Sequence, residues 1–155
     1  MKEKRDLKIQ AIENGTVIDH ITSGQALNVL RILGISSAFR ATISFVMNAS
    51  GARGRKDVVK IEGKELSVEE VNKIALISPK ATINIIRDFQ VVQKNNVVLP
   101  SYVEGVVRCK NSKCISNSSE PIESKFSVLQ SEEGVSLHCL YCEHVISEDI
   151  AENLL

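Results

Sequence analysis

The four cysteines of the chain form two close pairs, Cys109 with Cys114 and Cys139 with Cys142, and 24 residues separate the pairs. Two such pairs can bring four thiolates into one tetrahedron, which is the geometry that Zn²⁺ accepts at structural sites. The spacing therefore predicts one structural Zn²⁺ ion per chain, bound by all four cysteines.

The alternatives to a zinc site have less support in the sequence. Two disulfides would need an oxidising compartment, but the charged residues 1–6 lead into no apolar signal segment, so we expect a cytoplasmic protein. An iron–sulfur centre can use four cysteines and a redox pair needs one Cys-x-x-Cys, yet nothing else here indicates electron transfer. His138 and His144 flank the second pair and could replace a cysteine. Four thiolates already complete the shell, which leaves no position for a catalytic water.

Charge divides the chain into two halves. Residues 1–100 carry 15 Lys and Arg against 10 Asp and Glu, net +5, whereas residues 101–155 carry 4 against 9, net −5. No apolar run is long enough to cross a membrane. We therefore expect two small domains, 1–100 and 101–155, and no contact with membranes. An acidic zinc half also argues against nucleic acid as a partner, because such proteins are normally basic.

Strand and helix patterns alternate in the first half. The sequence predicts strands at 7–12, 17–21, 40–47, 56–61, 81–86 and 89–94, with a loop at 48–54. Capping boxes at Thr22-x-x-Gln25 and Ser67-x-x-Glu70 predict two helices, which end at Gly34 and before Pro79. This order is that of a ferredoxin-like α+β domain, in which both helices cover one face of an antiparallel sheet.

The second half has the pattern of a small all-β, zinc-ribbon-like domain. We expect a strand at 102–108 that leads into Cys109, and a hairpin of strands 126–130 and 135–138 across a turn at 132–134. About 55 residues bury little core, so the metal is expected to decide whether this domain folds.

The uncovered face of the predicted sheet gathers polar and charged side chains. Because successive strand residues point to opposite faces, Val59, Ile61, Ile83 and Ile85 point inward, and the residues between them point outward. The outward residues include Lys60, Asn84 and Ile86, to which Lys94, Asp19 and His20 can be added. This face could bind an anionic molecule with hydrogen-bonding ring edges, such as a nucleotide. The alternative is a solvated face whose lysines keep an edge soluble.

No catalytic motif accompanies this face. The glycine-rich segment 51–56 lacks the Gly-Lys-Ser/Thr ending of a P-loop and does not open a helix, so we interpret it as a hairpin loop from which Lys56 reaches a phosphate. An enzyme would need a positioned acid–base pair on the open face. Only Asp19 and His20 are candidates, and adjacent strand residues face opposite ways.

Several motifs together resemble the regulatory chain of aspartate carbamoyltransferase. They are Gly15-Thr-Val-Ile-Asp-His20, Ser50-Gly-x-x-Gly-Arg-Lys-Asp57 with Lys60, Ala81-Thr-x-Asn84, Cys109-x-Asn-Ser-x-Cys-Ile115 and Cys139-x-Tyr-Cys142. The resemblance runs from Leu7 to about Ser147, in register. It implies a non-catalytic subunit that controls pyrimidine biosynthesis allosterically, with CTP as inhibitor and ATP as activator at one shared site.

The resemblance also implies which residues bind the nucleotide. Lys60 would contact the pyrimidine carbonyl and ribose, Lys94 the phosphates, and Asp19 the ribose hydroxyls, with His20 near the phosphate end. Lys56 would reach a second nucleotide bridged by Mg²⁺. The residues that would line the base and sugar pocket are Ala11, Ile12, Val58, Asn84, Ile86, Phe89 and Val91. Gln10 and Phe89 depart from the acid and tyrosine of the best-known member, which affects base discrimination.

Family architecture supplies the implied partners. The zinc domain would dock onto the catalytic chain, and the first domains would pair as a homodimer across the strand at 40–47. Three such dimers would join two catalytic trimers. The alternative is a stand-alone zinc-ribbon protein that binds nucleic acid, which would need a basic, aromatic surface around the metal. The acidic second half has only Tyr102, Phe126 and Tyr141 as aromatic residues.

Overall fold

The computed structural model describes residues 12–35, 37–52 and 54–155. The chain divides into two compact units, with the boundary between Val97 and Val98. We call the part up to Val97 the sheet unit and Val98–Leu155 the cysteine unit. None of the helices among the described residues is long and apolar enough to cross a membrane.

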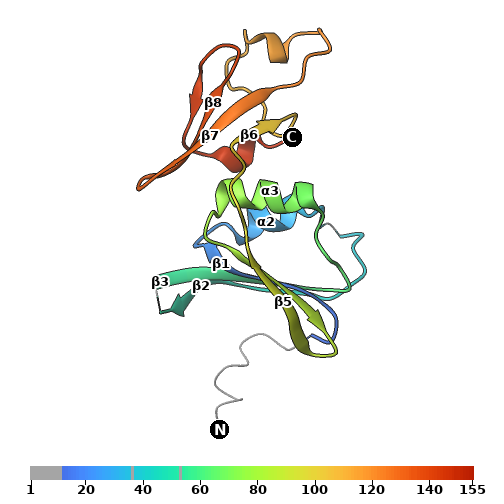
Figure 1. Cartoon of the computed structure of the whole chain (residues 1–155). Coiled ribbons are helices and arrows are strands. Elements are labelled where there is room, and N and C mark those ends of the chain that lie inside the picture. Colours follow the sequence, from blue (N-terminus) through green and yellow to red (C-terminus); the bar gives the residue numbers. More distant parts are fainter. Residues whose placement is uncertain (1–11, 36, 53) are drawn as a thin grey trace. The chain divides into compact units, whose positions relative to one another are not determined.

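The sheet unit is an antiparallel sheet with helices on one side. Its strand order is β2-β3-β1-β4-β5, and Figure 1 shows α2 and α3 over the same face of the sheet. The helices are α2 (Ala26–Ile32), after β1, and α3 (Val68–Ile77), after β3. The strands are β1 (Gly15–Thr22), β2 (Ile43–Gly51), β3 (Gly54–Glu62), β4 (Thr82–Arg87) and β5 (Gln90–Asn96). This order confirms the ferredoxin-like α+β fold, extended by β5 at one edge.

The start of α3 follows from its sequence. The Ser67 side chain accepts a hydrogen bond from the Glu70 backbone N–H (3.2 Å), and the Glu70 carboxylate accepts one from the Ser67 N–H (2.9 Å). This reciprocal pair satisfies two amide donors that the first turn leaves without helical partners. The predicted capping box is therefore confirmed here, and the helix ends before Pro79 as expected.

The start of α2 differs from the prediction. The cap residue is Gln25, and no side chain of the expected Thr22-x-x-Gln25 box caps the helix. Instead the Asp57 carboxylate, fully buried on β3, accepts hydrogen bonds at 2.9 Å from the N–H groups of Gly24 and Ala26. Because Asp57 lies far along the chain, local sequence could not reveal this cap. Asp57 also accepts a hydrogen bond from Asn48 N (2.8 Å), which ties β2 to the same point.

The hairpin of β2 and β3 is longer than predicted. The sequence suggested a loop at 48–54, but pairing continues to Gly51 opposite Gly54. Asn48, with φ of 58°, forms an irregularity in β2 where the register shifts. The bulge leaves Asn48 out of the strand ladder, and its N–H donates to the Asp57 carboxylate instead. The expected strand at 7–12 lies almost entirely outside the described residues.

The core of the sheet unit lies between the helices and one face of the sheet. Ile18, Val59 and Ile61 from the strands are fully buried, as is Ile74 from α3. Ile83 and Ile85 of β4 are also buried, as strand parity predicted. In α2 the buried residues are Ala26 and Val29, while Leu27 is 57% exposed.

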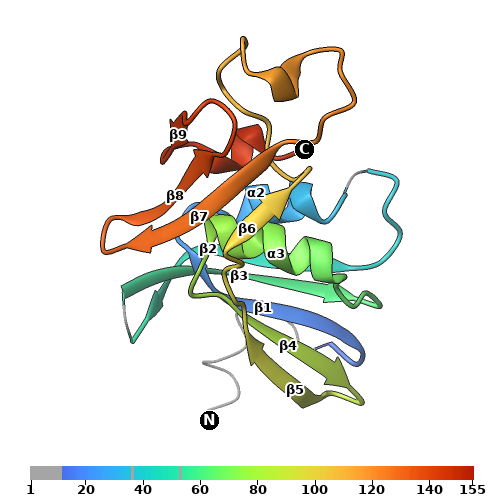
Figure 2. The same ribbon diagram turned by 45° about the horizontal axis from the view of Figure 1, so that its top comes forward.

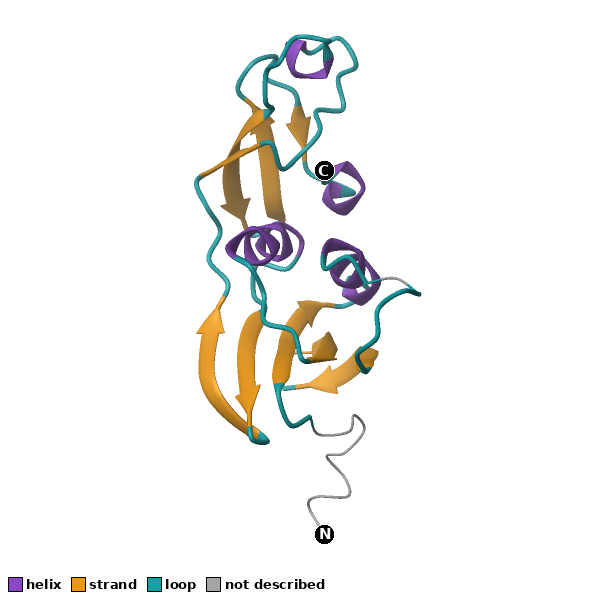
Figure 3. Cartoon of the chain, turned by 90° about the vertical axis from the view of Figure 1, so that its right-hand side faces the viewer, coloured by secondary structure: helices purple, strands orange, loops and turns teal. Residues whose placement is uncertain are grey.

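The cysteine unit contains a four-stranded antiparallel sheet with the order β6-β7-β8-β9, visible in Figure 2. Its strands are β6 (Tyr102–Glu104), β7 (Lys125–Ser131), β8 (Gly134–Cys139) and β9 (Val145–Ile146). Short 3₁₀ turns lie at Ile115–Asn117 and Ile150–Asn153; Figure 3 colours them with the helices. The predicted all-β class and the β7–β8 hairpin are confirmed.

The first strand of this unit is shorter than expected. The sequence predicted a strand at 102–108, but β6 ends at Glu104 because Gly105 has φ of +66°, which strands do not adopt. The chain then forms an isolated bridge between Val107 and Leu154, and the Arg108 N–H donates to the Asn153 carbonyl (2.7 Å). The segment before Cys109 is thus held by residues near the end of the unit.

Candidate metal centre and open sheet face

The four cysteine sulfurs converge on one point in the cysteine unit. All four Sγ atoms lie within 4.8 Å of one another, with Cys109 and Cys142 at 3.5 Å and Cys114 and Cys139 at 3.7 Å. A tetrahedral Zn²⁺ with Zn–S bonds of about 2.3 Å separates its sulfurs by about 3.8 Å. The separations exceed a disulfide bond, and all four cysteines are free thiols. The donor set and its spacing therefore fit a tetrahedral metal ion.

Each pair of cysteines is positioned by two neighbouring segments of the cysteine unit. Cys109 follows the bridge at Val107, and Cys114 immediately precedes the 3₁₀ turn Ile115–Asn117. Cys139 is the last residue of β8, and Cys142 lies in the turn that leads to β9. The metal site thus connects an irregular loop to the end of β8 and to the turn between β8 and β9.

Neighbouring polar groups hold the cysteine loops in place. The Asn117 amide donates to the Cys109 carbonyl (2.9 Å) and the Asn111 carbonyl (2.8 Å), which closes the first loop. The Ser116 hydroxyl lies 3.1 Å from Cys114 Sγ. In the second loop the Glu143 N–H donates to the Cys139 carbonyl (3.0 Å). Such contacts orient the ligands before a metal binds.

Hydrogen bonds and burial shift the thiol pKa values in opposite directions. A hydrogen bond from the Asn111 side chain, with one from the His144 backbone, lowers the pKa of Cys142 to about 6. Burial raises the pKa of Cys109 to about 12. A metal must bind thiolates, so its binding at neutral pH displaces protons from the buried sulfurs.

Strand register places the predicted open-face residues in one row. Lys60 of β3 pairs with Val17 of β1, Val17 pairs with Asn84 of β4, and Asn84 pairs with Lys94 of β5. Directly paired residues share a face, so Lys60, Asn84 and Lys94 lie on the side opposite to the helices. In the next row Ile86 pairs with Val91. The predicted parity of these residues is confirmed.

Two residues of this face are less accessible than expected. Asn84 is 9% exposed and Ile86 is 7% exposed, although strand parity indicated that they would face solvent. The Asn84 amide donates to the Val17 carbonyl of the neighbouring strand (3.2 Å), so this side chain lies along the sheet surface.

Asp19 and His20 lie together at a bulge in β1. The register with β3 shifts here, and His20 has φ of 57°. The alternation that would separate adjacent residues is therefore broken, contrary to the prediction that the two face opposite ways. Asp19 Oδ1 lies 2.9 Å from Lys56 Nζ and accepts from His20 N (2.7 Å), while His20 Nδ1 lies 3.2 Å from the Thr82 hydroxyl.

Burial and neighbouring charges shift the pKa values of two groups on the open face. Partial burial raises the pKa of Asp19, but hydrogen bonds from Lys56 and the His20 backbone outweigh it, and the net pKa is below the ordinary value. Burial lowers the pKa of Lys60. Asp19 is thus a stable carboxylate, and Lys60 is a partly desolvated cation.

The remaining predicted pocket residues lie around the β4–β5 turn and β3. Phe89 and Val91 are 64% and 57% exposed, and Phe89 has φ of 65° in the two-residue turn. Its N–H donates to the Glu13 carbonyl (2.9 Å), which holds the turn against the segment before β1. Val58 is half-buried and Ile12 is buried. Ala11 lies outside the described residues.

Sequence reasoning missed several residues that support these sites. Asp57 was quoted only as part of a motif, and its role in holding α2 and β2 depends on contacts between distant segments. Asn111 was named only within the first cysteine motif, and Asn117 was not singled out. Their position inside and just after the Cys109–Cys114 loop was the available signal, because such loops need internal hydrogen-bond donors.

Fold and site together define a two-unit α+β protein that joins a ferredoxin-like sheet to a four-cysteine module able to hold a metal ion. Two family models match: "Aspartate carbamoyltransferase regulatory chain, allosteric domain" at residues 7–98 and "Aspartate carbamoyltransferase regulatory chain, metal binding domain" at residues 101–152. The chain therefore belongs to the family of aspartate carbamoyltransferase regulatory chains, with an allosteric domain followed by a metal-binding domain.

Individual relatives agree with this assignment over the whole chain. The aspartate carbamoyltransferase regulatory chains of Methanosarcina mazei and Methanosarcina acetivorans are each 90% identical to it over 156 residues, which covers 100% of both chains. The regulatory chain of Methanococcoides burtonii is 59% identical over 151 residues, or 97% of this chain and 95% of the relative.

Proposed function

We propose that this chain is the non-catalytic allosteric subunit of aspartate carbamoyltransferase. In this proposal the sheet unit binds CTP and ATP on its open face, and the cysteine unit holds one Zn²⁺ ion and docks onto the catalytic chain. The observation that carries the proposal is the row formed by Lys60, Asn84 and Lys94, next to the Asp19–Lys56 pair.

The donor chemistry supports zinc as the metal. Four thiolates in a tetrahedron suit Zn²⁺, and a closed four-sulfur shell is typical of structural sites. The ligands would be Cys109, Cys114, Cys139 and Cys142, with one ion per chain. Free thiols also suit a reducing compartment, which supports a cytoplasmic location.

The row on the open face fits a nucleotide whose base binds at one end of the row and whose phosphates bind at the other. Lys60 and Lys94 are separated by two intervening strands, or about 14 Å between backbones. The Asn84 amide lies between them and can exchange hydrogen bonds with sugar or base. In the proposal Lys60 contacts the pyrimidine carbonyl and ribose, and Lys94 the phosphates.

The bulge in β1 would complete the site. In the proposal Asp19 accepts hydrogen bonds from the ribose hydroxyls, because its lowered pKa keeps the carboxyl group ionised. His20 and Lys56, which contact the same cluster, lie near phosphate. The apolar lining is provided by Ala11, Ile12, Val58, Ile86, Phe89 and Val91.

An edge strand supports pairing of two sheet units. β2 is an edge of the sheet, and its Phe45 and Met47 are 42% and 36% exposed. An edge strand with apolar side chains is a ready template for pairing with another copy. A regulatory homodimer joined across β2 would cover both residues. Effector binding must then favour one quaternary state, with a coupling free energy of about 1–3 kcal/mol.

Calorimetry of the zinc-loaded chain tests the effector site. CTP and ATP should bind to the wild-type chain, and Lys60→Ala or Lys94→Ala should weaken both by about tenfold or more, since each removes a charged contact of about 1.5–3 kcal/mol. Lys80→Ala is the matched control, because Lys80 is an exposed lysine in the turn after α3. Unchanged affinity in both site variants would refute this location for the effectors.

A further inference from the structure

The two pairs of cysteines are supported in different ways. Cys139 is the last residue of β8, pairs with Phe126 of β7, and donates its N–H to the His144 carbonyl (2.9 Å). Strands β7 and β9 lie on either side of β8, so the sheet itself holds this pair. Cys109 and Cys114 lie outside the strands, between β6 and β7. The position of the first pair must therefore come from other contacts.

Hydrogen bonds within residues 109–117, which we call the first cysteine loop, fix its shape. The Cys114 N–H donates to the Asn111 carbonyl (2.9 Å), and the Asn117 amide donates to the Cys109 carbonyl (2.9 Å). These groups all belong to the loop, so their bonds give it a conformation without setting its distance from the second pair of cysteines. A tetrahedral site needs both, because its four sulfurs must lie about 3.8 Å apart.

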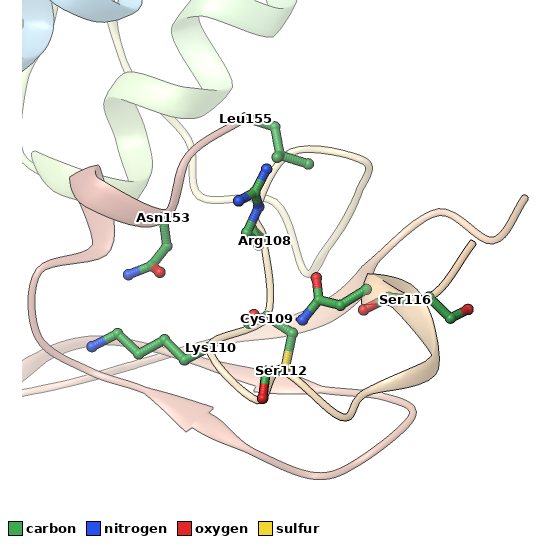
Figure 4. Close-up of a pocket in the computed structure, with 9 residues that line it drawn as sticks. Arg108, Cys109, Lys110, Ser112, Ser116, Asn153 and Leu155 are labelled. Atoms are coloured by element: carbon green, nitrogen blue, oxygen red, sulfur yellow. Dashed lines mark hydrogen bonds between the residues drawn. The ribbon is translucent and has the colours of Figure 1, made fainter. Parts of the chain in front are cut away.

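Residues 153–155 pair with residues 106–108, the backbone just before the first cysteine loop. The pairing is antiparallel and consists of a bridge with a hydrogen bond on either side. These contacts are the Val107–Leu154 bridge, the Arg108 N–H to the Asn153 carbonyl (2.7 Å) and the Leu155 N–H to the Val106 carbonyl (2.8 Å). Because the next residue is Cys109, the pairing fixes the point from which the loop begins. Figure 4 labels Arg108, Cys109, Asn153 and Leu155, which line one depression.

The pairing is anchored in the core of the cysteine unit. Val107 is fully buried, and Ile150 and Ala151 in the preceding 3₁₀ turn are buried as well. The Asn153 amide donates to the Asp149 carbonyl (3.0 Å), which ties the paired segment to the start of that turn. The segment that holds the loop is thus itself held by packed residues.

We infer that residues 153–155 are positioning residues for the metal centre, because their pairing with residues 106–108 holds the first cysteine loop where all four thiolates can bind one ion. The inference rests on the proposed function and adds a requirement to it. These residues follow the range 101–152 that the metal-binding domain model matches. Their side chains, one amide and two of leucine, are not zinc ligands, so they act through Cys109.

Cobalt titration of the full-length chain tests this inference. Co²⁺ occupies tetrahedral four-thiolate sites in place of Zn²⁺, and its thiolate-to-metal charge-transfer absorption reports how many thiolates are bound. The wild-type chain should give the spectrum of four thiolates. Deletion of residues 153–155 should remove about half of this absorption at saturating Co²⁺, since two of four ligands are released. It should also weaken Co²⁺ binding by about 10- to 100-fold.

A single substitution tests the same pairing at full chain length. Leu155→Pro removes the N–H that donates to the Val106 carbonyl, and Leu154, with φ of −74° and ψ of 139°, already has the backbone that a following proline requires. This variant should weaken Co²⁺ binding in the same direction as the deletion, but less. Leu155→Ala is the matched control, because it keeps the N–H, and it should bind Co²⁺ as the wild-type chain does.

A second control separates positioning of the ligands from general stability. Val103→Ala removes buried methyl groups on β6 and should lower the thermal stability of the cysteine unit. Because it leaves the 106–108 pairing intact, it should keep the spectrum of four thiolates.

Two outcomes overturn the inference. One is a four-thiolate spectrum with wild-type affinity in both the deletion variant and Leu155→Pro. The other is an equal loss of thiolate absorption in Val103→Ala, which would indicate that any loss of stability opens the site. If the wild-type chain itself binds Co²⁺ and Zn²⁺ with fewer than four thiolates, the proposed metal site fails and this inference fails with it.

Discussion

The two units reach a folded state by different means. The sheet unit buries a continuous apolar layer, with Ile18, Val59, Ile61 and Ile74 fully inaccessible between sheet and helices. In the cysteine unit Phe126 and Leu137 are fully buried, but three of its buried residues are cysteines themselves. A unit of this size cannot offset its chain entropy with so small a core, so a bound metal must supply the difference.

The two units differ in net charge as well as in the size of their apolar cores. The sheet unit is net positive and displays Lys60 and Lys94 on its open face, whereas the cysteine unit is net negative. In the proposed function the sheet unit binds an anionic small molecule and the cysteine unit binds a protein, and these two tasks have different electrostatic requirements. Because the two tasks are assigned to separate units, a substitution that impairs one unit should leave the other intact. Mutagenesis can test this independence.

The largest expected effect is that of zinc removal. A chelator should unfold the cysteine unit, because structural zinc contributes about 10–16 kcal/mol in comparable peptides. The sheet unit should keep its secondary structure and its amide protection. Hydrogen exchange followed by mass spectrometry measures both units in one experiment. Equal protection of the cysteine unit with and without metal would show that its apolar core suffices.

The next effect concerns the sheet unit. Asp57→Asn should lower its free energy of unfolding by about 3 kcal/mol, because the buried carboxylate accepts from Gly24, Ala26 and Asn48 and an amide cannot accept all three bonds. Urea titration followed by circular dichroism gives the value. Asp88→Asn, in an exposed turn, is the control and should change it by less than about 0.5 kcal/mol. Equal stability of the two variants would contradict the assigned role of Asp57.

A smaller effect of opposite sign is expected at Ser124 in the cysteine unit. Its hydroxyl is buried without a hydrogen-bond partner among the described residues. Ser124→Ala should therefore raise the stability of the zinc-loaded chain by about 1 kcal/mol. Thermal unfolding measures the change, with Ser127→Ala on β7 as the control. Destabilisation by Ser124→Ala would mean that the hydroxyl has a partner that stabilises the fold.

The smallest effect is a pH dependence at the open face. The folded state lowers the pKa of Asp19, so its ionised form adds stability above the unfolded pKa of about 3.9, and this is lost as pH falls through the folded value. Asp19→Asn should then be destabilised at neutral pH, and this loss of stability should shrink progressively as the pH falls below about 3.9. Urea titrations at several pH values test this, with the exposed Glu65→Gln as control. If Asp19→Asn stayed less stable than the wild-type chain in acid, its effect would come from lost packing and not from lost charge.

Much of both units could be predicted because the signals were local. The spacing of the cysteines indicated that Cys109 and Cys142 would meet, and strand parity put Lys60 and Asn84 on one face. The capping box at Ser67 worked for the same reason, since all of its hydrogen-bonding groups lie within one turn.

What could not be predicted depends on contacts between distant segments. The cap of α2 comes from Asp57, and no local pattern reveals a carboxylate that arrives from another strand. The bulges at His20 and Asn48 have positive φ, which tertiary packing imposes on residues that sequence statistics place in strands or turns. β9 has two residues, too few to show a period.

One measurement tests the separation of the two units most directly. An ¹H–¹⁵N correlation spectrum of the zinc-loaded chain is recorded with CTP and then with a chelator. CTP should shift signals around Lys60, Asn84 and Lys94, and the chelator should then collapse the signals of the cysteine unit while those of the sheet unit remain dispersed. Absence of any CTP-induced shift, or a cysteine unit that stays folded without metal, would contradict this account.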